Sequence, residues 1–204
     1  MSATARIGFW AALGACLAGS AYTVAQLLQV AGLLPDPLDR ILIFAPSLVL
    51  APAFVLTMCA VCDRAGQARR VYGLAALATA IMYAVLVSIV YVTQLGVVIP
   101  HDLNGTGTSV AYLACCGQGQ FTTGLDLLGY TLMSISTLVA APVFTGHAWT
   151  QRWLVANGLL APFLVAQLAW PALIVIGALW LITFPAAMAA AALVFGRQTD
   201  AGPA

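Results

Sequence analysis

Long runs of apolar residues dominate this sequence and restrict what it can fold into. Six such segments can be drawn, at residues 7–34, 41–62, 71–99, 122–146, 152–170 and 172–195. A helix needs roughly 20 apolar residues to cross a bilayer, whereas barrel strands alternate over about ten. The sequence therefore predicts an all-α integral membrane protein. We expect residues 1–196 to form a single domain of six transmembrane helices and residues 197–204 to form a short polar tail.

The composition supports this class and excludes others. Hydrophobic residues make up 63% of the chain and charged residues only 6%, too little polar surface for a soluble globule. The net charge of +1 and the absence of lysine exclude a nucleic-acid surface, which needs clustered basic residues. The sequence has no P-loop, zinc-protease, serine-hydrolase or dinucleotide-binding motif. The expected surroundings are therefore a lipid bilayer, and no motif identifies a reaction or a cofactor.

The arginines indicate how the chain lies in the membrane. Positive residues collect on the cytoplasmic side of a membrane protein. A cytoplasmic N-terminus leaves only Arg40 outside. The other six then lie inside: Arg6, Arg64, Arg69, Arg70, Arg152 and Arg197. We therefore expect both termini in the cytoplasm and one long outer loop, Pro100 to Phe121, between the third and fourth helices. The alanine-rich composition without lysine favours the inner membrane of a bacterium.

Asp126 is the most informative polar residue, because it follows the long loop and begins an apolar segment. At about 100° per residue it shares a helix face with Tyr130 and Ser134. A charge in hydrocarbon costs on the order of 2.5–3.5 kcal/mol, so this face should turn inward or toward water. Asp126 has two interpretations. It either stabilises a helix N-terminus in the headgroup region or is half-buried and binds a cation, a proton or an amine.

Other segments carry polar groups at a similar depth, which predicts an outward-open polar cavity among the first, third, fourth and fifth helices. The alternative is a hydrogen-bonded network that only holds the helices together. We assign no catalytic or metal-binding residue. The candidate ligand-binding residues are Asp126, Tyr130, Ser134, Tyr22, Gln26, Gln29, Tyr91, Gln94, Gln167 and His101.

Four of the five cysteines form two pairs in the sequence, and the predicted topology separates these pairs. Cys59 and Cys62 fall at the cytoplasmic end of the second helix, and Cys115 and Cys116 in the outer loop. A membrane's thickness far exceeds the approximately 4.4–6.8 Å between the Cα atoms of a disulfide, so the predicted topology argues against a thiol relay between the pairs. Because a ring between adjacent cysteines is strained, we expect Cys115 and Cys116 to be reduced, packed in the loop, or paired between chains.

Three functional interpretations remain open. The first is a protein that binds a small solute or lipid in the outer cavity, as a transporter component. In size and span number the chain is similar to the small substrate-binding subunits of bacterial vitamin importers, a likeness of architecture without a motif. The second is an accessory subunit whose polar faces serve assembly, in a homo-oligomer or with a membrane partner. The third is an intramembrane enzyme that uses Asp126 and His101 as acid and base.

Overall fold

The computed structural model describes residues 3–200, with side chains for residues 3–197. It confirms the all-helical prediction: 83% of the chain is helical, and the described residues contain no strand. Five helical stretches are long and apolar enough to cross a membrane, as in a multi-pass membrane protein. They are Ala3–Val30, Leu38–Arg64, Arg70–Leu103, Phe121–Phe144 and Pro171–Arg197.

The long helices are joined by short helical pieces. The long ones are α1 (Ala3–Val30), α2 (Leu38–Arg64), α3 (Arg70–Thr93), α5 (Phe121–Ala140) and α9 (Trp180–Asp200). Because α9 continues to Asp200, it includes the start of the predicted polar tail, and residues 201–204 lie outside the described part. The short pieces are η1 (Gln94–Val98), α4 (Ile99–Leu103), η2 (Gly107–Leu113), η3 (Ala141–Phe144), α6 (Ala148–Gly158), α7 (Ala161–Ala166), η4 (Pro171–Leu173) and α8 (Ile174–Gly177).

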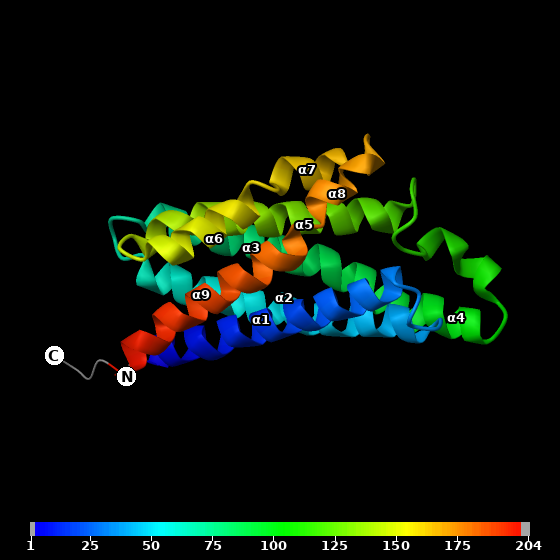
Figure 1. The fold of residues 1–204 in the computed structure, drawn as a ribbon, viewed down its shortest axis with the longest axis horizontal. Coiled ribbons are helices and arrows are strands. Elements are labelled where there is room, and N and C mark those ends of the chain that lie inside the picture. Colours follow the sequence, from blue (N-terminus) through cyan, green and yellow to red (C-terminus); the bar gives the residue numbers. More distant parts are fainter. Residues whose placement is uncertain (1–2, 201–204) are drawn as a thin grey trace.

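The helices form one elongated bundle (Figure 1). Helix α1 packs against α2 and α9, and α3 lies between α2 and α5. The start of α1 and the end of α9 lie at one end of the bundle, whereas α4 and residues 103–121 extend from the other (Figure 1). We call this second end the loop end. The arrangement places the polar stretch of the sequence at the loop end and away from both termini.

The fifth apolar segment is broken, which the sequence did not predict. In place of one helix over residues 152–170, α6 ends at Gly158 and α7 begins with Pro162 in its first turn. Proline suits a first turn because the amide hydrogen that it lacks has no partner there. Helices α6 and α7 both pack on α5, and the chain runs along them back toward the loop end (Figure 1). Neither piece is long enough to span a membrane by itself, so a sixth crossing stays a prediction.

Glycines allow the helices to approach closely. A Cβ atom on Gly158 of α6 would lie 2.8 Å from the Cα atom of Leu138 in α5, and one on Gly73 of α3 would lie 2.8 Å from the Cα atom of Cys62 in α2. Neither distance leaves room for a side chain. Membrane helices pack through such small residues because lipid provides no hydrophobic driving force between them.

Large apolar side chains cover the outside of the bundle. On α3, Ile81, Val85, Ile89 and Val92 are each about half exposed, whereas Tyr83, Val87 and Val90 on the same helix are fully buried. A soluble protein rarely exposes such a continuous apolar surface. This pattern is typical of a helix with one face on lipid and the other in a packed core.

Candidate functional site

Asp126 lies on α5 near the loop end, and one of its carboxylate oxygens has no partner. The Oδ1 atom is buried and forms no hydrogen bond, while the Tyr91 side chain of α3 interacts with the carboxylate. Among the described residues, no basic side chain forms an ion pair with Asp126, because both ion pairs found there belong to Arg40. The acid therefore retains unused capacity to bind a positive group.

Four tyrosines lie near this carboxylate, and we refer to them as the tyrosine cluster. They come from three helices, and each lies close enough for electrostatic interaction with Asp126: Tyr22 of α1, Tyr83 and Tyr91 of α3, and Tyr130 of α5. The Tyr91 hydroxyl donates a hydrogen bond of 2.8 Å to the Tyr130 hydroxyl. The structure thus brings together four predicted site residues: Asp126, Tyr22, Tyr91 and Tyr130.

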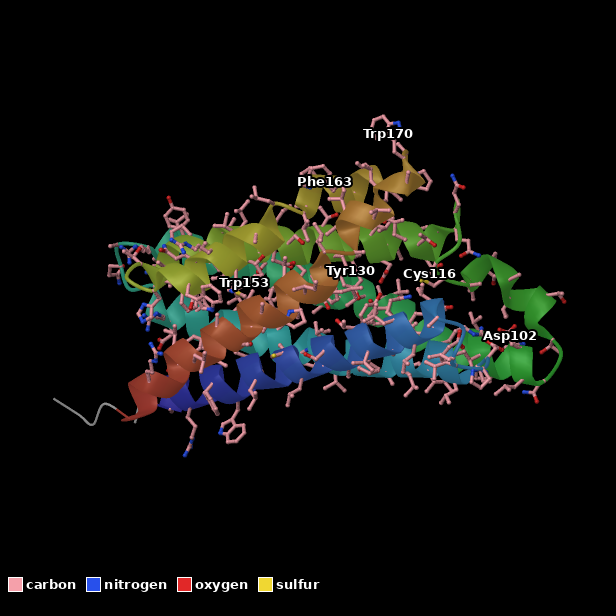
Figure 2. The ribbon with its side chains drawn as sticks, in the orientation of Figure 1. Asp102, Cys116, Tyr130, Trp153, Phe163 and Trp170 are labelled. Carbon is pink, nitrogen blue, oxygen red and sulfur yellow. A yellow bond between two sulfur atoms is a disulfide. The ribbon has the colours of Figure 1, made fainter. Side chains whose placement is uncertain are left out.

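Aromatic packing fixes the position of the cluster. The Tyr130 ring lies edge-on to Trp180 of α9 with a centroid distance of 4.8 Å, and to Tyr83 at 6.1 Å. Tyr22 also lies edge-on to Trp180, at 5.5 Å. Edge-to-face pairs in this range are favourable. Tyr130 lies within the bundle, and Cys116 lies nearer the loop end (Figure 2).

Gln94 positions the loop. This buried residue lies where α3 passes into the π-helical turn η1. Its Nε2 atom donates to the Leu113 carbonyl at 2.8 Å, and its Oε1 atom accepts from the Cys115 amide at 3.0 Å. Both ends of the side-chain amide are therefore occupied by the backbone of the loop. The sequence placed Gln94 at the site, and in the structure its contacts there are to the protein itself.

The predicted site residues of α1 form hydrogen bonds with one another and with α2. The Tyr22 hydroxyl donates to Gln26 at 3.2 Å, Gln26 donates to Gln29 at 2.9 Å, and Gln29 donates to Asp39 of α2 at 2.8 Å. Side-chain hydrogen bonds of this kind hold membrane helices together. For Gln26 and Gln29 the geometry thus matches the helix-holding interpretation.

The remaining predicted site residues lie apart from this group or lack contacts with it. Ser134 is fully buried, and its hydroxyl has no partner. Gln167 is half-buried at the end of α7, where its amide is in close contact with Gly177. The His101 Nδ1 atom lies 2.8 Å from the Thr106 hydroxyl in its own loop. No hydrogen bond in the described part of the chain joins His101 to Asp126, so the acid–base pair of the enzyme interpretation is not assembled.

Cys115 and Cys116 form a disulfide with each other, which corrects the expectation that adjacent cysteines stay reduced or pair between chains. The loop holds them in place: the Cys116 amide donates to the Thr123 hydroxyl at 3.1 Å, and Thr122 donates to the Ala114 carbonyl. Cys116 has a φ of +86°, in the left-handed region that non-glycine residues rarely adopt. Ring strain in the two residues alone leaves out these contacts, which fix the backbone around the disulfide.

A second polar group lies at the loop end, around Arg40. Its guanidinium contacts Asp36 and, across to α4, Asp102, both at 2.6 Å. An open hollow of about 460 Å³ borders Arg40 and Asp102 and also the loop from Gly105 to Ala114. Because both Asp36 and Asp102 pair with this one guanidinium, the hollow offers no unpaired positive charge to an anion.

A buried network that the sequence did not reveal joins three helices. Asn157 of α6 donates to the Thr137 hydroxyl of α5 at 3.0 Å and accepts from the Thr183 hydroxyl of α9 at 3.0 Å. Asn157 is fully buried. Polar groups inside a bilayer need such partners because no water is present. This network therefore explains how the broken segment is held.

The site consists of one partly unpaired acid, a cluster of phenol groups and an adjacent disulfide, all near the loop end. No protein-family model, curated protein or solved structure matches this chain.

Proposed function

We propose that this chain is a multi-pass membrane protein that binds a small, positively charged solute at the loop end of its bundle. Asp126 is the principal contact, with Tyr91 and Tyr130 beside it. The observation that carries the proposal is the buried Asp126 oxygen without a partner. A buried charge without a partner is costly, and an amine or quaternary ammonium group would offset that cost.

The aromatic residues support a cationic ligand over an anionic one. Phenol and indole rings attract cations at their faces, and the attraction grows when water is excluded. The tyrosine cluster provides such rings near the carboxylate, and Trp180 packs against two of them. An anion would meet Asp126 without a described basic residue to balance it.

The proposal includes a topology, with six crossings of a bacterial inner membrane and the loop end outside. In this topology α6 and α7 together make the fifth crossing. It is supported by the arginine distribution and by the location of the start of α1 and the end of α9 at one end of the bundle (Figure 1). An outward-facing site would suit a component of a transporter.

The test compares solute binding by the wild-type chain and by Asp126→Asn, purified in detergent without reductant. Native mass spectrometry detects any co-purified solute, and thermal shift with methylammonium and tetramethylammonium gives affinities. We expect the variant to lose the solute and to bind the better amine about tenfold or more weakly, since losing one charge contact costs more than about 1.4 kcal/mol. Asp63→Asn, an exposed acid at the far end of α2, is the matched control. Equal binding by both variants, or no binding by the wild type, would contradict the proposal.

A further inference from the structure

Three groups that can bind metal converge beside the disulfide. The sulfur atoms of Cys115 and Cys116 and a carboxylate oxygen of Asp126 all lie within 4.8 Å of one another. We propose that reduction of the disulfide creates a binding site for one thiophilic divalent metal ion, of the class of zinc and cadmium. The metal site shares Asp126 with the solute site. It differs in using the two cysteine sulfur atoms and in forming only after reduction.

The types and spacing of these atoms match that class of metal. Zinc is bound by cysteine sulfur at about 2.3 Å and by carboxylate oxygen at about 2.0–2.2 Å, in a tetrahedron. Two ligand atoms of such an ion are then about 3.5–3.8 Å apart. This separation is compatible with the three atoms here, which all lie within 4.8 Å of one another. Sulfur donors select zinc and cadmium over magnesium and calcium. Three protein ligands leave the fourth position to water.

The loop keeps the cysteines beside Asp126 by contacts that do not involve sulfur. Gln94 holds the Cys115 amide and the Leu113 carbonyl from one side. Thr123 of α5 accepts from the Cys116 amide and donates to the Gly117 carbonyl at 2.8 Å. Because these bonds remain when the disulfide opens, both thiols stay near the carboxylate.

The carboxylate itself is available for a metal. Its Oδ1 atom is buried and forms no hydrogen bond, and no described arginine or histidine pairs with it. Two thiolates and one carboxylate would place three negative charges around a doubly charged ion. In the oxidised chain the carboxylate is the only charged ligand left.

The redox step balances with a dithiol as reductant. The dithiol gives two electrons and two protons to the bond between Cys115 and Cys116 and becomes a disulfide itself. The chain then carries two thiols. When the metal ion binds, both thiol protons pass to solvent and two metal–sulfur bonds form.

The experiment uses the full chain in detergent with Cys16, Cys59 and Cys62 replaced by serine, because these free cysteines would also bind metal. The protein is reduced, freed of reductant without oxygen, and titrated with Cd²⁺. Thiolate-to-metal charge transfer in the ultraviolet is recorded together with the metal content per chain. We expect one Cd²⁺ per chain with a charge-transfer band after reduction, and neither before it.

Two further variants separate this site from adventitious binding. Cys116→Ser should remove the tight binding, whereas Asp126→Asn should keep the charge-transfer band but weaken the affinity about tenfold or more. Asp63→Asn should behave as the reduced parent. The proposal is overturned if the oxidised protein binds Cd²⁺ equally, if the reduced protein binds none, or if Asp126→Asn binds as tightly as Asp63→Asn. Solute binding is measured on the oxidised chain, so each proposal can fail without the other.

Discussion

At the residue scale, the sequence identifies Asp126 but not the residues that support it. An acid beginning an apolar segment is conspicuous in a chain with six acidic residues. The role of Gln94 depends on backbone atoms 19 and 21 residues away, and helical periodicity carries no information about a loop that folds back. The pairing of Cys115 with Cys116 was missed because ring strain in the two residues alone leaves out the loop contacts that fix their backbone.

Replacing Gln94 tests its role in holding the loop. Gln94→Leu removes the hydrogen bonds to the Leu113 carbonyl and the Cys115 amide, and at about 0.5–1.5 kcal/mol for each bond the loss is about 1–3 kcal/mol. We expect the free energy of unfolding to fall by that amount and amide hydrogen exchange over residues 107–120 to quicken. Thr93→Val is the control, because Thr93 is partly exposed and its hydroxyl donates to the Ile89 carbonyl of its own helix and not to the loop; it should change stability by less than about 0.5 kcal/mol. Unchanged exchange in Gln94→Leu would show that the loop is held by other contacts.

At the element scale, periodicity predicts the long helices well and the broken one poorly. The predicted segments overlap α1, α2, α3, α5 and α9, with boundaries shifted by several residues. The fifth segment is apolar enough to resemble a helix, yet Gly158 and Pro162 divide it. Proline inside an apolar segment indicates a kink, and only the packing of α6 and α7 on α5 shows that the helix ends there.

The close contact between α6 and α5 predicts a strong effect of a single methyl group. Gly158→Ala would place its Cβ atom 2.8 Å from the Cα atom of Leu138, so the helices must separate. Overpacking of this kind costs about 1–3 kcal/mol, and we expect a corresponding loss in the free energy of unfolding measured in mixed micelles.

Gly124→Ala on α5 is the matched control for that substitution. No atom lies within 4 Å of the added Cβ atom there, and alanine favours a helix by about 1 kcal/mol over glycine. The control should therefore be neutral or more stable. Equal destabilisation of the two variants would contradict the close approach of α5 and α6.

At the scale of the whole molecule, composition and length predict the class of protein, and the structure agrees through five candidate membrane spans. The arrangement of the spans could not be predicted, because it depends on glycines and buried polar groups that meet across helices. The tyrosine cluster is such a case. Tyr22, Tyr91 and Tyr130 are predicted site residues, but Tyr83 is not among them, and the structure shows that it packs against Tyr130 and lies near Asp126.

Thiol labelling in intact cells tests the proposed topology. In a chain whose only cysteines are Cys115 and Cys116, a membrane-impermeant maleimide should label the loop after treatment with an impermeant reductant, and not before. Asp63→Cys, with all other cysteines replaced by serine, should react only after the membrane is permeabilised. Labelling of Asp63→Cys in intact cells would show that the loop end faces the cytoplasm.

The network around Asn157 has a consequence for biogenesis. Helix α6 contains Gln151, Arg152 and Asn157 within 11 residues, and such residues oppose insertion of a lone segment by the translocon. The partners of Asn157 lie on α5, made earlier, and on α9, made later. The nascent chain therefore has no complete set of partners for α6 until α9 leaves the ribosome. The part of the chain from α6 to α9 should enter the bilayer as one late unit, and a chain that stops before α9 should leave α6 outside the hydrocarbon.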